Sequence, residues 1–339
     1  MKNIKVLIIN VLSLAIILSV VFFFYKAFRA NWTNVQSYTL HLNYLFIALS
    51  FISVLSTYLL TTYAWFLILN SLSSDVKITF SESVATVNTS SLTKYIPGKV
   101  WSYTLQMYWL AKKGFSKSLI LYVNMITVFI TLITALILGL GYLVFFASAF
   151  SATVSIASFV ILIVFDIAFV KYNSTIFNNI ITVINKVFKR EIKYFDTSNK
   201  LLIYLHVINI IAAFCYGMGA YLACLGIGFE VAYRDMFTVM ASMIISDVIG
   251  FLAIIVPGGL GVREGIMYLL LHGVSSGALS LVLPIATRIV TMLVDISLGT
   301  IGFIILYQKK GDKIRVSKFK AKSRYRKVMG FRPRLTKVK

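Results

Sequence analysis

The residues best suited to chemistry in this sequence lie in one short stretch, residues 256–265, which reads Val-Pro-Gly-Gly-Leu-Gly-Val-Arg-Glu-Gly. Pro257 has no backbone N–H and its ring clashes with the preceding helical turn, while glycine is the poorest helix former after proline. A continuous helix therefore cannot pass through this stretch, in which three glycines follow the proline within four residues: Gly258, Gly259 and Gly261.

Two opposite charges, Arg263 and Glu264, follow this break directly. Apolar segments flank them at residues 236–255 and 266–271, and each is too short or too interrupted to be a comfortable spanning helix. Irregular backbone at membrane depth is tolerated only where it is buried in protein or lines a wet cavity. Charged side chains at that depth are costly and mark functional sites by default. The stretch is therefore interpreted as the floor of a binding site.

The composition of the chain places these residues in a membrane. Apolar residues make up 59% of the 339 residues and charged residues only 13%, whereas soluble domains contain about 45–50% and about 25%. An all-α, polytopic membrane helix bundle is expected. Runs of about 20 apolar residues predict full spans at residues 4–25, 42–69, 119–146, 152–170, 201–225 and 278–307. Two further segments, residues 80–111 and 236–272, are each broken by Pro-Gly and predict pairs of half-helices.

The chain also contains an internal repeat. The dipeptides Pro97-Gly98 and Pro257-Gly258 lie 160 residues apart, and the Met-Tyr pairs at residues 107–108 and 267–268 keep the same offset. The order of span, broken pair and span occurs twice, and the single span between the copies reverses the second copy. This order predicts an inverted-topology repeat whose broken segments meet near the membrane midplane, as in many secondary transporters. Chance identity of a few dipeptides is the alternative.

The expected organisation has five parts. An N-terminal helix and outer loop occupy residues 1–41, and the first copy of the repeat, broken at 97–98, occupies residues 42–148. The fourth span and an amphipathic cytoplasmic surface helix fall within residues 149–200, because apolar residues recur at helical spacing over residues 176–188. The second copy, broken at 257–261, occupies residues 201–308, and a basic tail occupies residues 309–339.

Two motifs carry a resemblance to a known family. Residues 257–265 closely resemble a motif of the lysylphosphatidylglycerol synthase transmembrane region family, the flippase-like domain of the multiple peptide resistance factor. Residues 95–101, Tyr-Ile-Pro-Gly-Lys-Val-Trp, look like its earlier motif, and Arg288 also fits. The resemblance covers about residues 40–308 and implies a lipid-handling membrane domain, since members are linked to moving lipids between leaflets. In bifunctional members a soluble aminoacyltransferase domain follows, whereas here a short tail follows the last expected helix.

The geometry of a broken helix suits an anion. A half-helix that begins after Pro-Gly presents free backbone N–H groups and the positive end of its dipole, and glycine lets a phosphate approach the backbone. Lys99 and Arg263 stand just beyond the two breaks, and Arg288 lies within the last apolar span. The expected substrate-binding residues are Pro97, Gly98, Lys99, Pro257, Gly258, Gly259, Gly261, Arg263, Glu264 and Arg288.

Acidic residues are expected to support this site. Asp295 lies two turns beyond Arg288 on the same helix face, about 10 Å away at a rise of about 1.5 Å per residue, so the two cannot touch. Each needs a partner elsewhere, and Asp247 and Glu264 are the candidates. The alternative is a buried network of these charges that only locks the bundle together.

The net charge of +22 is unevenly distributed, because fourteen Lys and Arg residues and one Asp follow residue 307. Further basic residues precede the third span and lie between the fourth and fifth spans. The positive-inside rule places these regions, and both termini, in the cytoplasm, where a basic tail also associates with acidic lipids. Nucleic acid is not expected as a partner, because no aromatic platform or folded reader accompanies the charge.

Catalytic and metal-binding patterns are not found in the sequence. Cys215 and Cys224 lie in one apolar segment and are expected to pack, and the three histidines show no ligand spacing. We therefore expect no cofactor, metal or enzyme activity, and a bacterial or archaeal inner-membrane protein that binds and flips an anionic lipid or its glycan or aminoacyl derivative. The alternatives are a secondary transporter of a small anionic solute and a scaffold for a separate lipid-modifying or glycosyltransferase enzyme.

Overall fold

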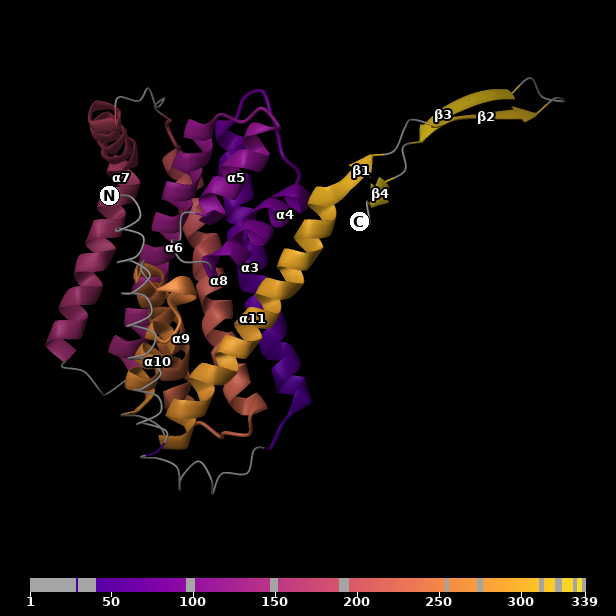
Figure 1. Cartoon of the computed structure of the whole chain (residues 1–339). Coiled ribbons are helices and arrows are strands. Elements are labelled where there is room, and N and C mark those ends of the chain that lie inside the picture. Colours follow the sequence, from indigo (N-terminus) through magenta and orange to yellow (C-terminus); the bar gives the residue numbers. More distant parts are fainter. Residues whose placement is uncertain are drawn as a thin grey trace, which may run out of the picture.

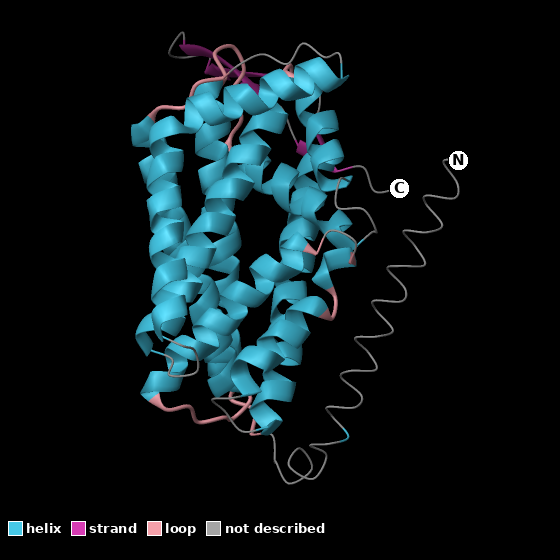
Figure 2. Cartoon of the chain, turned by 90° about the vertical axis from the view of Figure 1, so that its left-hand side faces the viewer, coloured by secondary structure: helices cyan, strands magenta, loops and turns pink. Residues whose placement is uncertain are grey.

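The computed structural model of the chain is a bundle of membrane helices (Figures 1 and 2). It describes residues 29, 41–95, 101–146, 152–188, 195–253, 256–272, 277–310, 314–320, 325–331 and 334–336. Six of the described helices are long and apolar enough to cross a membrane. They are α3 (Tyr44–Leu72), α6 (Lys117–Phe146), α7 (Ala152–Phe188), α8 (Asn199–Gly226), α9 (Tyr233–Leu252) and α11 (Gly277–Tyr307). The predicted all-α, polytopic class is confirmed.

Shorter helices connect these spans at the two predicted breaks. The first break follows α4 (Phe80–Ser91) and η1 (Leu92–Tyr95) and precedes α5 (Trp101–Ala111). The second break contains η2 (Pro257–Gly259) and precedes α10 (Val262–His272). Pro97, Gly98 and Lys99 of the first break lie outside the described residues.

Five of the six predicted spans coincide with long helices, and the span predicted at residues 4–25 lies outside the described residues. The prediction of a half-helix at residues 236–255 is wrong in length. α9 has 20 residues, which rise about 30 Å at about 1.5 Å per residue and can cross a membrane. Its apolar run reaches Leu252 before the break at Pro257 begins, so the break shortens α10 rather than α9.

The predicted fourth span and the amphipathic segment after it are two parts of α7. The backbone is non-helical at Tyr172, with φ −113° and ψ 16°, and this residue separates the two parts. Phe177 and Ile181, one turn apart in the second part, are buried. The Phe177 ring lies 5.4 Å from that of Tyr122 on α6, so the apolar face of the segment packs onto the bundle.

The two broken segments are hairpins that enter the bundle and turn back (Figure 1). Glu82 at the start of α4 lies 2.5 Å from Lys113 just beyond α5, so the first hairpin returns to the end at which it began. In the second hairpin the backbone folds onto α9, because a Cβ added to Gly259 would lie 2.8 Å from the Gly250 carbonyl oxygen. The hairpin tips meet, since a Cβ on Gly258 would lie 3.2 Å from the Tyr95 ring.

The helices α3 and α8 form a close antiparallel seam through the bundle. The Ser50 hydroxyl donates to the Gly219 carbonyl at 2.7 Å, and the Ser53 hydroxyl donates to the Cys215 carbonyl at 2.7 Å. One turn further along, the Thr57 hydroxyl donates to the Ala212 carbonyl at 3.0 Å. Small residues and hydroxyl groups that bond across the interface are the usual means by which helices associate in lipid.

Two further helix pairs match one another, α4 with α11 and α9 with α6. A Cβ on Gly299 of α11 would lie 2.5 Å from Leu92, just beyond α4, and a Cβ on Gly139 of α6 would lie 2.8 Å from Ile245 of α9. These two glycines are 160 residues apart, the offset of the sequence repeat. Equivalent packing in the two copies, and the antiparallel α3 and α8, agree with an inverted repeat, which stays a prediction.

The basic tail after α11 contains secondary structure that the sequence reasoning did not predict. The strands are β1 (Gln308–Lys310), β2 (Ile314–Lys320), β3 (Tyr325–Phe331) and β4 (Arg334–Thr336). β1 pairs with β4 and β2 pairs with β3, both antiparallel (Figure 1).

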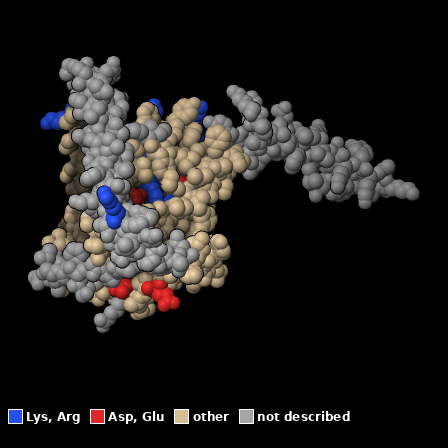
Figure 3. Space-filling model, turned by 60° about the horizontal axis from the view of Figure 1, so that its bottom comes forward, with Lys and Arg blue, Asp and Glu red and all other residues tan. Residues whose placement is uncertain are grey.

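The two ends of the bundle differ in charge. The connection between α8 and α9 contains Glu230 and leads to Asp235, and Figure 3 shows acidic side chains at that end of the molecule. The basic tail and the connection that contains Lys112 and Lys113 lie at the other end (Figure 1). The positive-inside rule therefore predicts that the tail is cytoplasmic and that the connection of α8 to α9 is external.

Cysteine labelling tests this orientation. In a variant without Cys215 and Cys224, Val231→Cys should react with a membrane-impermeant thiol reagent in intact cells, because the rule places it outside. Ser317→Cys should react only after the cells are permeabilised. Reaction of Ser317→Cys in intact cells would show that the orientation of the whole bundle is opposite to the predicted one.

Candidate functional site

The tip of the second hairpin is built from glycines because its backbone lies in the left-handed region. Gly258 and Gly259 have φ values of +58° and +65°, which side chains other than glycine rarely adopt. Pro257 and Gly259 are buried. The Gly258 carbonyl accepts a hydrogen bond from Nη1 of Arg288 at 3.2 Å, so the turn presents backbone polar groups to a basic side chain of α11.

Arg263, in the first turn of α10, reaches across to two other helices. Its Nη1 lies 2.9 Å from Oδ1 of Asp247 on α9, and its Nη2 donates to the hydroxyl of Tyr216 on α8. The side chain passes α9 at Gly250, where an added Cβ would lie 2.1 Å from Cγ of Arg263. Glycine at position 250 therefore provides the space through which Arg263 reaches the interior.

A methyl group at position 250 should displace Arg263. We expect Gly250→Ala to abolish the Arg263–Asp247 contact and most of the activity that depends on it, because the three atoms nearest to the added Cβ, at 2.1 to 3.5 Å, all belong to the Arg263 side chain. Gly265→Ala is the matched control, since a Cβ there meets no atom within 4 Å. That control should leave activity unchanged and add up to about 1 kcal/mol of stability through helix propensity. Equal activity of the two variants after reconstitution in proteoliposomes would contradict this prediction.

Arg288 lies in the middle of α11 and faces Glu264 of α10. Its Nε is 3.6 Å from Oε1 of Glu264, and the other carboxylate oxygen accepts from the backbone N–H of Gly261 at 2.5 Å. Glu264 thus occupies the N-terminus of α10, where free N–H groups attract negative charge. The Arg288 side chain is only 9% exposed, and its Nε and Nη2 have no hydrogen-bond partner within the described residues.

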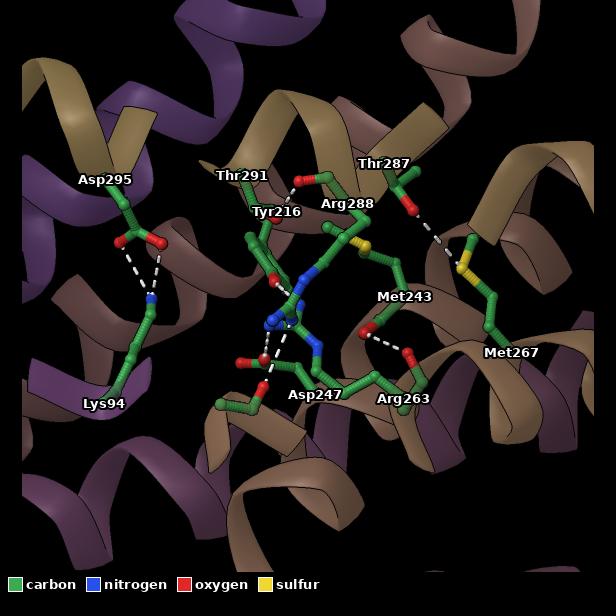
Figure 4. Close-up of polar contacts among 12 residues, drawn as sticks. Lys94, Tyr216, Met243, Asp247, Arg263, Met267, Thr287, Arg288, Thr291 and Asp295 are labelled. Carbon is green, nitrogen blue, oxygen red and sulfur yellow. Dashed lines mark hydrogen bonds and ion pairs between the residues drawn. The ribbon is translucent and has the colours of Figure 1, made fainter. Parts of the chain in front are cut away.

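A third ion pair joins the first hairpin to α11. Lys94 Nζ lies 2.6 Å from Asp295 Oδ2, and the Tyr95 hydroxyl donates to the same carboxylate at 2.7 Å. The side chain of Asp295 is 1% exposed, whereas that of Lys94 is 26% exposed. Lys94 also lies 3.4 Å from the Tyr58 hydroxyl on α3. Figure 4 shows this pair to one side of Arg263 and Arg288, whose side chains extend toward one another beside Asp247.

The structure therefore brings most of the predicted residues to one place. Glu264, one of the two acidic candidates named from the sequence, pairs with Arg288, whereas the other candidate, Asp247, pairs with Arg263. The sequence reasoning missed four further residues, of which Lys94 was detectable as a charge in a broken apolar segment. The other three are tyrosines. Tyr95 begins the motif at residues 95–101, whereas the positions of Tyr58 and Tyr216 give no signal in a single sequence.

Two cavities, each lined by both polar and apolar side chains, adjoin these charges. The larger, of about 300 Å³, is lined by Lys94, Arg263 and Asp247 and extends between α3, α5 and α6. The second, of about 230 Å³, shares Tyr58 and Asp247 with the first and is bounded by α3, α6, α8 and α9. Basic groups that line a cavity inside a helix bundle can hold an anion there. Within the described residues no group of three His, Cys, Asp or Glu side chains could hold a metal ion.

A search of curated proteins found no match. A family model described as the lysylphosphatidylglycerol synthase TM region matches residues 10–299. This match begins before residue 40, where the resemblance carried by the motifs begins, and it includes both hairpins. Because this match spans most of the chain, the chain belongs to the lysylphosphatidylglycerol synthase TM region family.

Proposed function

We propose that this membrane protein binds an anionic lipid headgroup between its two hairpins and moves the lipid from one leaflet to the other. The observation that carries the proposal is the convergence of Lys94, Arg263 and Arg288 on one region. These three basic residues come from the first hairpin, the second hairpin and α11, and two of them line the larger cavity. Charged residues within membrane helices mark substrate pathways by default.

A phosphate is the anion that suits these groups best. Guanidinium groups bind phosphate through two parallel hydrogen bonds, and Arg288 has two buried nitrogens, Nε and Nη2, without a hydrogen-bond partner in the described residues. The Glu264 carboxylate sits against both Arg288 and the N-terminus of α10, so it holds the place that a phosphate oxygen would take. The space between Glu264 and the two arginines is about 10 Å³, so a phosphate binds there only after Glu264 moves.

The inverted order of the two copies supplies a route for movement. One hairpin enters from each end of the bundle, and their tips meet at Tyr95 and Gly258. Movement of the hairpins, with the helices packed on them, against the joined α3 and α8 would open the region between the tips first to one side and then to the other, as in other transporters built from inverted repeats. A headgroup held at the tips would then cross while its acyl chains stay in lipid.

Reconstitution tests the proposal. Proteoliposomes that contain the purified chain and a labelled anionic phospholipid should show movement of the label between leaflets, measured by its accessibility to an external quencher. Arg263→Ala and Arg288→Ala should each lower the rate about tenfold or more, the loss of one charge-assisted hydrogen bond or more. Normal movement by both variants would contradict a lipid-binding role for this site.

The same preparation separates the alternatives. A chain without residues 309–339 should keep lipid movement, because the tail lies outside the hairpins. Loss of function on removal of the tail, with the hairpin variants normal, would favour a scaffold. Uptake of a soluble anion without movement of the labelled lipid would favour a solute transporter.

A further inference from the structure

Two ionisable side chains of the spanning helices lie away from the hairpin tips. Asp166 belongs to α7 and His206 to α8, and Nε2 of His206 lies 3.0 Å from Oδ1 of Asp166. The His206 side chain is 11% exposed and that of Asp166 is 18% exposed. Neither residue takes part in the ion pairs at the tips. Ionisable residues within spanning helices are costly and mark ion pathways and proton relays by default.

Both ring nitrogens of His206 face an acceptor. Nδ1 lies 2.8 Å from the Leu202 carbonyl oxygen on the preceding turn, and Nε2 faces the Asp166 carboxylate. A neutral imidazole has only one N–H, so one nitrogen would then direct a lone pair at an oxygen atom. The imidazolium form donates to both acceptors and also pairs with the carboxylate. The geometry therefore fits a His206 side chain that holds an additional proton.

The other charged residues of the surrounding helices are remote from this pair or engaged elsewhere. α6 has no charged residue after Lys117, its first residue. The next charged residue of α7 is Lys171, which lies over the Tyr172 ring at 5.3 Å. The other charged residue of α8 is Lys200, which is exposed. Among the described residues, the two members of the pair are therefore each other's only ionic partner, and the charge of the pair depends on one proton.

A groove of about 390 Å³ lies beside the pair, between α6, α7 and α8. Its described lining residues include no third titratable side chain, and all of them except Thr134, Asp166 and His206 are apolar. The Thr134 hydroxyl has no hydrogen-bond partner within the described residues, although the residue is only 3% exposed. A hydroxyl is both a donor and an acceptor, so it can receive a proton from one neighbour and pass one to the next.

Polar side chains continue from this groove into the second cavity. One turn from Thr134 and His206 on the same two helices, the Thr131 hydroxyl donates to Oδ1 of Asn209 at 2.8 Å. Thr131 and Asn209 line the second cavity, which reaches Asp247, the partner of the arginine in the second hairpin. Successive turns of α6 and α8 therefore carry polar groups from the groove to that ion pair.

We propose that the Asp166–His206 pair is a proton-binding site and that lipid movement is coupled to protons taken up there. The proposal rests on the proposed function and adds its energy source. When the imidazolium gives its proton to the hydroxyl groups of α6 and the proton reaches Asp247, the ring becomes neutral and the Asp247 carboxylate becomes a carboxylic acid. Arg263 then loses its ionic partner and becomes available to a phosphate. Proton and anionic lipid therefore favour each other's binding and move in the same direction.

A pH gradient across proteoliposomes tests the coupling. The vesicles contain the full chain in phosphatidylcholine with a trace of labelled phosphatidylglycerol, whose phosphodiester keeps one negative charge at neutral pH. One proton that moves with one such lipid transfers no net charge, so the pH difference alone drives the pair. With an acidic outside and a difference of about one pH unit, the label should accumulate up to about tenfold in the inner leaflet. Collapse of the gradient should abolish the accumulation, and vesicles without protein measure passive movement.

Two substitutions separate a proton site from a structural ion pair. His206→Arg keeps a positive charge beside Asp166 but cannot release a proton, and the adjoining groove has room for the longer side chain. This variant should keep the unfolding midpoint of the parent chain and lose the gradient-driven accumulation. Asp166→Asn removes the carboxylate that favours the imidazolium and should lose the accumulation as well. His272→Gln, which changes an exposed histidine of α10, is the control and should accumulate the label as the parent chain does.

The outcomes distinguish failure of this proposal from failure of the proposed function. Lipid movement without accumulation under the gradient would overturn the coupling and leave the proposed function standing. Normal accumulation in His206→Arg would show that the pair only joins α7 to α8. A neutral His206 ring in nitrogen NMR spectra of the full chain at acidic pH would overturn the proton site itself. If no lipid moves under any condition, the proposed function fails and the coupling fails with it.

Discussion

Arg288→Lys is expected to slow lipid movement about tenfold or more while thermal unfolding stays close to that of the parent chain. Lysine keeps the positive charge opposite Glu264, so the buried carboxylate remains compensated. It loses the planar fork that grips a phosphate through two hydrogen bonds, and such a charge-assisted bond contributes about 1.5–3 kcal/mol. This variant should therefore lose lipid movement while it keeps its thermal stability.

The measurement pairs lipid movement in proteoliposomes with the unfolding midpoint in detergent. Arg29→Lys, the same substitution at an exposed position outside the cluster, is the control. If Arg288 only locks the helices together, Arg288→Lys should retain movement, and Arg288→Ala should instead lose about 3–5 kcal/mol by leaving Glu264 unpaired. Unchanged movement in Arg288→Lys would argue for that structural role.

Lys94→Met is expected to destabilise the chain by about 3–5 kcal/mol, more than Asp295→Asn does, although the two variants break the same ion pair. The asymmetry follows from burial. Removal of Lys94 leaves the carboxylate of Asp295, whose side chain is 1% exposed, with only the Tyr95 hydroxyl as its described partner. Removal of Asp295 leaves an ammonium group that is 26% exposed and lines the cavity, where water can reach it.

The double variant Lys94→Met/Asp295→Asn should recover most of the stability lost by Lys94→Met, because no unpaired charge then remains. Unfolding free energies of the four chains, measured in one detergent, give the interaction energy of the pair. Equal losses in both single variants would mean that water reaches Asp295. An additive double variant would mean that the pair contributes little beyond its two separate residues.

The membrane class, the long helices and both breaks could be read from the sequence because each depends on local pattern. Runs of about 20 apolar residues predict spans directly, and Pro257 with its glycines stops a helix whatever surrounds it. The length of α9 was harder to predict from the sequence. Its apolar residues continue up to the break, and a single sequence does not say on which side of a break the longer helix lies.

Which charged residues pair depends on three-dimensional contacts. The sequence therefore narrowed the candidate partners of each charged residue only partly. Asp247 and Glu264 were candidates because buried arginines need carboxylates, and the helix rise excluded a direct contact of Arg288 with Asp295. The true partner of Asp295 is Lys94, 201 residues away in the chain, and only the folding of the first hairpin brings it there. The contacts of the Tyr58 and Tyr216 hydroxyls with these charges were not predictable, since an isolated tyrosine in an apolar helix usually packs.

The seam between α3 and α8 has a mechanical consequence. Its three hydroxyl-to-carbonyl bonds keep one register along the two helices, so a slide of one residue would break all of them together. Bonds of this kind contribute about 0.6 kcal/mol each on average in membranes, about 2 kcal/mol for the set. Sliding of α3 along α8 is thus resisted, and we expect these two helices to move together as one rigid unit. We expect hinge motion relative to this pair in the hairpins and in the helices packed on them, α6 and α11.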